Sequence, residues 1–287
     1  MERYFDVELN AIKKKVLLMG GSVESQLQNV LQALIERNVD LAIRVVGNDM
    51  LINTLDLEID EACLKLLALH HPRAGDLRFI TTAMKISTEL ERMSDLAENI
   101  AERVIELNEE PQLKPYIDIP RMAEWTSRMV KECLDAFVNR DAELARKVCQ
   151  DDGFVDDLTE QLFRELVSFM LEDSRAITRA TRLTFIGKYY ERIADHATNI
   201  AELVVYMVEG KLSGTWRCRN ERRARIILED FYGPSADRPI GRSDKPDDGW
   251  VHSSVFLRPV SRMPTPPTRL SAPVSHGGRD FSTNRHT

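Results

Sequence analysis

The sequence predicts an all-α protein, made of two tandem, pseudo-symmetric three-helix bundles followed by a disordered C-terminal tail. Three observations support this fold class. Apolar residues recur at helical spacing over long segments, and no sustained alternation of Val, Ile and Thr indicates a strand. In addition, the dodecamer ERMSDLAENIAE at 91–102 returns one hundred residues later as ERIADHATNIAE at 191–202, with eight of twelve positions identical. A repeat of this kind indicates an internal duplication.

The apolar spacing predicts six helices, in two groups of three. Their expected ranges are 5–37, 39–69, 76–107, 118–139, 141–172 and 174–209. Four of the twelve prolines precede residue 212, and they fall between these ranges or at their ends, where proline does not interrupt a helix. Asn38 and Asp141 are expected N-caps, Pro72 follows the second helix, and Gly210 is expected to end the sixth.

The break between the third and fourth helices divides the chain into domains. We expect a first bundle over 4–109 and a second over 117–210. Residues 212–287 differ in composition, with eight of the twelve prolines and 13 Lys and Arg against 8 Asp and Glu. Such a segment buries too little apolar area to fold alone, so we predict a disordered tail; a membrane-surface or partner-binding arm is the less favoured interpretation.

Charge and terminal sequence exclude two classes of partner. The 287-residue chain has a net charge of −7, which argues against nucleic-acid binding because phosphate contacts need a basic patch. The N-terminus is charged throughout, and no apolar run is long enough for a signal sequence or a membrane span. These features predict a cytoplasmic protein without membrane insertion.

The repeated dodecamer is an acidic stripe on a helix. At 100° per residue, its polar residues fall within about 80° of the first one, Glu91, and the apolar residues lie on the opposite side. The stripe contains Glu91, Asp95, Glu98, Asn99 and Glu102 in the first copy, and Glu191, Asp195, Asn199 and Glu202 in the second. Neighbouring carboxylates repel each other, whereas a face that serves only solubility normally alternates Glu with Lys.

The preceding helix of each copy carries a matching stripe. It contains Asp49, Asn53, Asp56 and Asp60 in the first copy, and Asp152 and Asp156 at the equivalent places, 103 residues later, in the second. If the two helices are neighbours, several side-chain oxygens converge with no basic group on the same stripes. Such oxygens suit Mg²⁺, Ca²⁺, Mn²⁺ or ferric iron. A merely acidic, solvated surface remains the alternative.

Several motifs together resemble the PhoU family of phosphate-uptake regulators. They are the doubled E-R-x-x-D-x-x-x-N-I-A-E segment, LLMGGSVE at 17–24, HPRAGDLRFITTAMKISTELERMSD at 71–95 and VEGK at 208–211. The resemblance covers residues 1–211. It implies two pseudo-symmetric three-helix bundles, on whose surface paired E(D)xxxD motifs form multinuclear metal sites, described with iron or zinc; magnesium or manganese are further options.

Matching the motifs residue by residue assigns candidate metal ligands. The resemblance implies Asp49, Glu91 and Asp95 in the first bundle, and Asp152, Asp156, Glu191 and Asp195 in the second. Asn53 stands where the motif has its second acid. Because an amide oxygen ligates without bringing a charge, the first site is expected to bind more weakly. His196 lies off the stripe and is expected to be structural.

The resemblance also implies a function. It suggests a cytoplasmic, non-enzymatic and homodimeric adaptor between the ATPase subunit of a phosphate ABC transporter and a phosphate-sensing histidine kinase, which dampens the starvation response in abundant phosphate. Two alternatives remain open: a regulator of a different transporter, and a helical scaffold without metal. A di-iron enzyme is disfavoured because the chain has no Glu-x-x-His pair, and no activated nucleophile is apparent.

Overall fold

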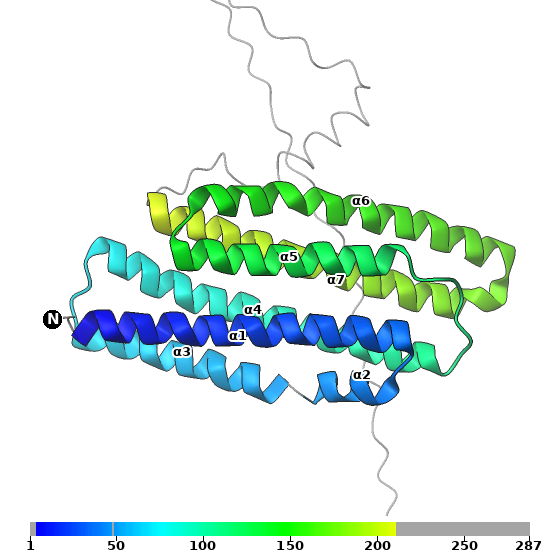
Figure 1. Ribbon diagram of the computed structural model, residues 1–287, viewed down its shortest axis with the longest axis horizontal. Helices are drawn as coiled ribbons and strands as arrows, with labels where there is room; N and C mark the ends of the chain where they lie inside the picture. The colour runs from blue at the N-terminus through cyan, green and yellow to red at the C-terminus, as the bar shows by residue number, and fades with distance from the viewer. Residues whose placement is uncertain (1–3, 48, 211–287) are drawn as a thin grey trace, which may run out of the picture. The chain divides into compact units, whose positions relative to one another are not determined.

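The structure, a computed structural model, describes residues 4–47 and 49–210, and all regular secondary structure in these ranges is helical (Figure 1). The helices are α1 (Tyr4–Glu36), α2 (Val39–Val46), α3 (Asp49–Leu69), α4 (Ala74–Asn108), α5 (Asp118–Asn139), α6 (Ala142–Glu172), the 3₁₀ helix η1 (Ser174–Ala176) and α7 (Ile177–Glu209). The all-α prediction is confirmed. The predicted disordered tail, 212–287, lies outside the described residues.

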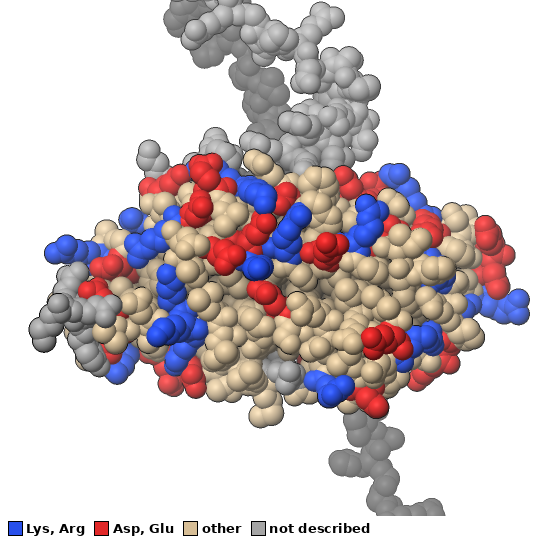
Figure 2. Space-filling view, in the orientation of Figure 1, with Lys and Arg blue, Asp and Glu red and all other residues tan. Residues whose placement is uncertain are grey.

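The described helices form two layers. In the first layer α3, α4, α7 and α6 lie side by side in that order, so α3 and α6 are the edge helices (Figure 1). In the second layer α1 packs on α3 and α4, α5 packs on α6 and α7, and α1 and α5 touch each other. The face seen in Figure 2 carries acidic and basic side chains interspersed. Within these ranges no helix is long and apolar enough to span a membrane.

The duplication is visible in this arrangement. α1 corresponds to α5, α4 corresponds to α7, and α2 with α3 corresponds to α6, so the two predicted three-helix bundles are confirmed. One prediction was wrong: the expected helix over 39–69 is two helices, α2 and α3. α2 ends at Gly47, whose backbone N–H still donates to the Ile43 carbonyl at 3.1 Å. Glycine is among the weakest helix formers, and α6 has Gln150 at the equivalent place and continues through it.

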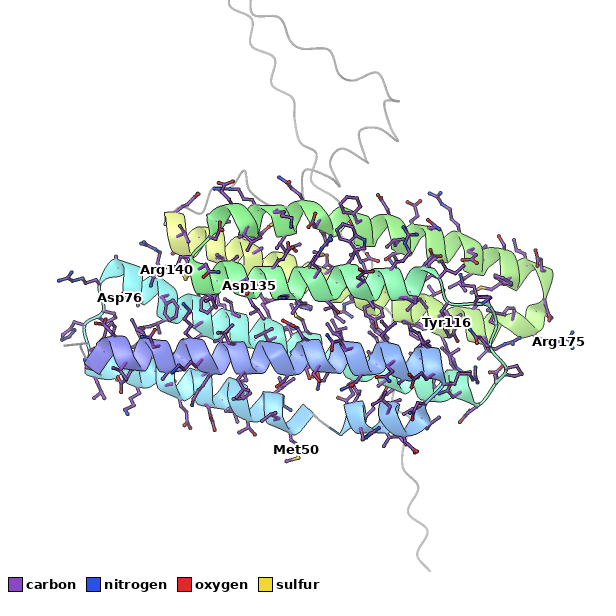
Figure 3. All side chains as sticks on the ribbon, viewed as in Figure 1. Met50, Asp76, Tyr116, Asp135, Arg140 and Arg175 are labelled. Carbon is purple, nitrogen blue, oxygen red and sulfur yellow. The ribbon has the colours of Figure 1, made fainter. Side chains whose placement is uncertain are left out.

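Helix ends follow the capping residues that the sequence offers. Arg37 and Arg140, equivalent in the two repeats, end α1 and α5 in the left-handed region, with φ of 55° and 53° (Arg140 is labelled in Figure 3). The side chain of Asn38 accepts from the Leu41 backbone N–H, and that of Asp141 accepts from Glu143 and Leu144. Both predicted N-caps are confirmed. Gly210 ends α7 with φ 68°, as expected.

The core contains the apolar half of each repeated dodecamer. Ala97, Ile100 and Ala101 are fully buried, and so are Ala197, Ile200 and Ala201. Between the layers, a Cβ placed on Gly20 would collide with the Leu134 side chain. Gly20 therefore allows α1 of the first bundle to approach α5 of the second.

The segment between the bundles is held by long cationic side chains. Arg37 Nη2 donates to the carbonyls of Leu107, Asn108 and Glu110, at 3.3, 3.1 and 2.6 Å. The ammonium group of Lys114, whose side chain is only 4% exposed, contacts Glu165 of α6 and lies 3.9 Å from Asp118 Oδ2. These contacts fix the path of the chain from α4 to α5.

Candidate functional site

The acidic stripes face outward. α4 and α7 have neighbours on both flanks and are covered by α1 and α5, which leaves the outer face of the four-helix layer for their remaining side chains. Asp95 is exposed there, while Glu91, Glu191 and Asp195 are half-buried. The predicted separation of a core face from an acidic face is confirmed.

In the first repeat, the candidate ligands lie on two packed helices. Asn53 is exposed on α3, and Glu91 and Asp95 lie on α4, which packs against α3. Asp49 begins α3, but its side chain lies outside the described residues. Further along α3, burial and the nearby Asp56 carboxylate raise the pKa of Asp60. Negative charge is therefore crowded along this helix.

In the second repeat, the candidates lie on α6 and α7. On α6, Asp152 is half-buried and Asp156 is exposed. The other two candidates, Glu191 and Asp195, lie on α7, which packs against α6. Lys188 Nζ lies 2.5 Å from Glu191 Oε2. The expectation that no basic group lies on these stripes is therefore wrong for this repeat. Lys188 is one turn before Glu191, where a long cationic side chain reaches a carboxylate.

The donor set has the right chemistry for a hard cation, but the side chains are not gathered around one point. Carboxylate and amide oxygens on adjacent helices are ligands that such ions accept. Among the residues whose side chains the structure describes, no three His, Cys, Asp or Glu side chains stand close enough to hold one ion. Binding would therefore require side-chain rotation on the outer face and, at Glu191, exchange of the lysine for the ion.

Both repeats match one protein-family model. The PhoU domain model aligns with residues 16–104 and again with 119–204, so each match includes one complete acidic dodecamer. The chain belongs to the PhoU domain family.

Curated PhoU relatives match over most of their length. A phosphate-specific transport system accessory protein PhoU homolog of Aquifex aeolicus is 45% identical over 205 residues, which covers 71% of this chain and 93% of the relative. The PhoU accessory protein of Escherichia coli is 34% identical over 207 residues, covering 72% of this chain and 86% of the relative. A crystal structure of PhoU from Pseudomonas aeruginosa superposes with a TM-score of 0.70 at 41% identity, covering 72% of this chain and 100% of that one.

The contact between α4 and α7, here called the seam between the two PhoU repeats, contains a polar network that the sequence did not reveal. His196 Nδ1 on α7 lies 2.7 Å from Glu89 Oε2 on α4, and Asn199 Nδ2 donates to the same oxygen at 3.0 Å. Burial would raise the pKa of Glu89, but these hydrogen bonds and the charges of His196 and Arg92 outweigh it and leave the pKa below its ordinary value. Glu89 thus links the repeats.

A sequence signal for this network exists in retrospect. Glu89 and His196 occupy positions where the other copy has Tyr189 and Leu96. Each copy therefore has a residue beside the contact between α4 and α7 that differs from its equivalent in the other copy. Glu89 and His196 meet only because α4 packs against α7, and the sequence alone does not show that these two helices are neighbours.

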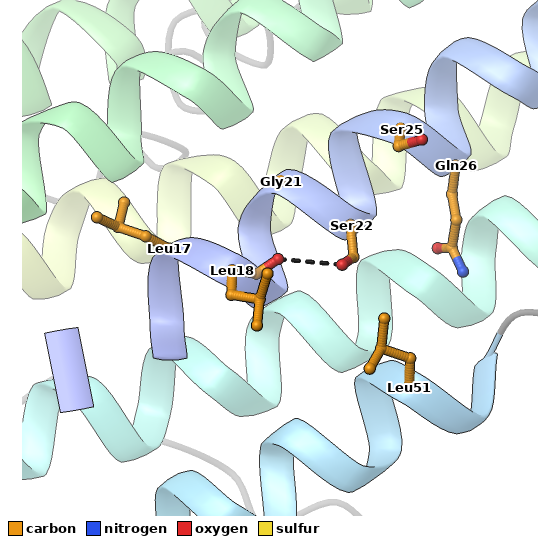
Figure 4. A pocket seen from close by; sticks show the side chains of 7 residues that line it. All are labelled: Leu17, Leu18, Gly21, Ser22, Ser25, Gln26 and Leu51. Atoms are coloured by element: carbon orange, nitrogen blue, oxygen red, sulfur yellow. Dashed lines mark hydrogen bonds between the residues drawn. The ribbon is translucent and has the colours of Figure 1, made fainter. Parts of the chain in front are cut away.

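The LLMGGSVE motif of this PhoU domain protein lies beside a groove between α1 and α3 (Figure 4). The groove measures about 370 Å³ and is lined by Leu17, Leu18, Gly21, Ser22, Ser25, Gln26 and Leu51. Its two glycines have different surroundings, because Gly20 faces Leu134 whereas a Cβ on Gly21 would meet nothing within 4 Å. The motif combines a packing position with an open surface position.

Proposed function

We propose that this PhoU domain protein is an accessory regulator of phosphate transport. It would act in the cytoplasm as a non-enzymatic adaptor between the ATPase subunit of a phosphate ABC transporter and a phosphate-sensing histidine kinase, and would dampen the starvation response when phosphate is abundant. The observation that carries the proposal is the family match in both repeats, together with relatives named phosphate-specific transport system accessory proteins that align over 86–93% of their length.

The geometry supports an adaptor role. An adaptor needs rigid, exposed surfaces of defined charge, and both repeats present acidic stripes on one side of a packed helical layer. The α1–α3 groove adds an open apolar surface. Rigid-body docking on preformed helices avoids the entropy cost of ordering a flexible segment on binding.

We also propose that the acidic stripes bind metal ions. Asp49, Asn53, Glu91 and Asp95 would hold the first site, and Asp152, Asp156, Glu191 and Asp195 the second, with iron or zinc as the expected ions and magnesium or manganese as further options. When bound, the ions would neutralise carboxylates that otherwise repel one another, and would give a partner protein a surface of different charge.

A deletion strain of the host organism tests the regulatory role. Phosphatase expression in this strain should remain high in abundant phosphate, because the dampening signal is lost, and a plasmid carrying the full chain should restore repression. Normal repression in the deletion strain would contradict the proposal and would instead favour a regulator of a different transporter.

The same strain separates the metal proposal from the regulatory one. A plasmid-borne chain with Glu91, Asp95, Glu191 and Asp195 all changed to Ala should accumulate to the normal level, because these side chains lie outside the core. If this chain restores repression fully, regulation needs no metal and the helical scaffold suffices. Loss of repression together with loss of bound metal supports both proposals.

A further inference from the structure

The α1–α3 groove is open in the first repeat, whereas the equivalent place in the second repeat is filled. Helices α1 and α3 correspond to α5 and α6 at an offset of 103 residues. At this offset, three residues that line the groove have large equivalents: Ser22, Ser25 and Leu51 correspond to Trp125, Arg128 and Phe154. The same position between two helices thus has small or aliphatic side chains in one bundle, and aromatic and cationic side chains in the other.

In the second bundle, the three large side chains form one stack. The rings of Trp125 and Phe154 lie with their centroids 4.4 Å apart and their planes inclined by 21°. The guanidinium of Arg128 lies over the Trp125 ring, with Cζ 3.5 Å from the ring centroid. Stacking and cation–π contacts stabilise an aromatic ring beyond the burial of its area. This place between the helices is therefore suited to a flat aromatic ring.

In the first bundle, the groove has apolar edges and a polar floor. Leu18 and Leu51 are 58% and 51% exposed at its edges, and Figure 4 shows Leu51 extending from α3 toward Ser22 on α1. Gln26 lines the groove although it is only 3% exposed, so it lies at the floor. Its Oε1 accepts from Ser94 at 2.9 Å, and within the described residues its amide nitrogen donates no hydrogen bond. The groove thus offers a hydrogen-bond donor beneath apolar walls.

The face of α1 that borders the groove is uncharged, whereas the same face of α5 is charged. Five residues of α1 stand where α5 has three basic and two acidic side chains, namely Leu18, Gly21, Ser25, Gln28 and Asn29. Burial does not account for the difference, because four of the five positions are exposed and one is half-buried on both helices. Charged residues are depleted in the core of protein–protein interfaces. The uncharged face of α1 therefore has the composition of an interface.

We propose that the α1–α3 groove receives a large aromatic side chain from a segment of a partner protein whose contact face is otherwise uncharged. The ring would lie beside Leu51, where the second bundle has its own Trp125, and an oxygen of the same segment would accept a hydrogen bond from the Gln26 amide. An aromatic side chain anchored in a pocket is the usual centre of a protein interface.

The length of the uncharged face favours a protein segment over a free aromatic compound. From Leu18 to Asn29 this face extends over about 16 Å of helix, which is longer than one ring. The occupant is a partner of the proposed adaptor, so the inference rests on the proposed function for the existence of that partner. Binding of an aromatic ring to the groove does not depend on it, and the two are measured separately.

Binding of 5-fluoroindole to the purified full chain, followed by fluorine NMR, tests the ring site. The parent chain should shift the probe signal saturably. Ser22→Trp supplies the ring from the chain itself, as Trp125 does in the second bundle, and should abolish this binding. Ser168→Trp is the matched control and should bind like the parent, because the hydroxyls of Ser22 and Ser168 both donate to the carbonyl four residues earlier, at 3.0 and 3.3 Å. A parent chain that does not bind the probe, or equal binding by Ser22→Trp, would overturn the ring site.

Trp125→Ser tests whether the two places are equivalent. Removing this ring should lower the melting temperature and open a second groove, so that the chain binds two probe molecules instead of one. The probe should then raise the melting temperature of Trp125→Ser more than that of the parent, because ligand binding stabilises the folded state. A Trp125→Ser chain that gains no probe binding would contradict the equivalence on which the ring site rests.

Complementation of the deletion strain tests the partner. Ser168→Trp should restore repression like the parent, whereas Ser22→Trp, at equal accumulation, should not. Restored repression with Ser22→Trp would overturn the partner, and a sedimentation coefficient that differs between Ser22→Trp and the parent would assign the groove to a second copy of the chain instead. Normal repression in the deletion strain itself would contradict the proposed function, while the probe measurements still decide the ring site.

Discussion

The two acidic faces differ at single residues. Lys188 contacts Glu191 in the second repeat, whereas Thr88 stands at the equivalent position of the first. The first repeat instead replaces a carboxylate by the Asn53 amide. An ion binding to the second face would have to displace an ammonium group, while an ion binding to the first would meet one negative charge fewer. Both departures would weaken the proposed metal binding, through different causes.

Lys188→Met should strengthen metal binding in the second repeat. An exposed ion pair contributes up to about 1 kcal/mol, so its removal should raise the affinity by up to about fivefold. Competitive titration with Mn²⁺ measures the change. Lys147→Met is the matched control, because Lys147 is also 53% exposed and pairs with Glu132 at 2.9 Å, away from both candidate sites. Unchanged or weaker binding in Lys188→Met would argue that Glu191 is not a ligand.

Glu89→Gln should weaken the seam between the repeats. The amide keeps the shape of the carboxylate but removes its negative charge, and so weakens the hydrogen bonds that Glu89 accepts from His196 and Asn199. The free energy of unfolding should fall by about 1–3 kcal/mol. Urea denaturation measures this loss. Combining it with His196→Leu, the residue found at position 96, should give less than the sum of the two single effects. Strict additivity would mean that the two side chains do not interact.

At the scale of elements, the connection from α4 to α5 fixes how the bundles join. Arg37 donates to three backbone carbonyls at and just after the end of α4, those of Leu107, Asn108 and Glu110. Arg182 of α7 donates to the side chains of Glu106 and Glu110, at 3.0 and 2.8 Å. Lys114 places a buried ammonium group between α5 and α6. A buried charge is tolerated because opposite charges and hydrogen bonds replace its water.

Lys114→Met should destabilise the protein strongly. Removing the ammonium group leaves the Asp118 carboxylate, only 4% exposed, without its buried cation, and breaking a buried ion pair costs about 3–5 kcal/mol. The free energy of unfolding is measured in urea, with the exposed Lys147→Met as reference. A loss below about 1 kcal/mol would show that the Lys114 contacts add little, as is usual for pairs at the surface.

The features of the helices that the sequence predicted correctly depend on residues close together in the chain. Asn38, Asp141 and Gly210 identify helix ends because capping depends on a few adjacent residues. The break at Gly47 was missed, since apolar periodicity continues across it. The acidic stripes were predictable from helical geometry, and Lys188 could have been found by its spacing from Glu191. Burial of Lys114 and the pairing of Glu89 with His196 depend on helices far apart in the sequence, which no local pattern reveals.

At the scale of the whole described helical region, the duplication produces one continuous layer. α4 and α7 meet in the middle, and the acidic faces of both repeats lie on the same side, opposite α1 and α5. A repeated core face follows from a repeated fold. A repeated acidic face, whose carboxylates repel one another, is better explained by a ligand, and metal binding in both repeats is the central proposal.

Elemental analysis of the purified full chain, after equilibration with iron or zinc and gel filtration, tests this proposal most directly. The parent chain should retain metal. Each double variant, Glu91→Ala with Asp95→Ala or Glu191→Ala with Asp195→Ala, should retain only the metal bound by the other repeat. The variant with all four substitutions should retain none, while keeping the helical circular-dichroism spectrum of the parent. A parent chain without metal, or a fourfold variant that retains as much as the parent, would contradict metal binding at these faces.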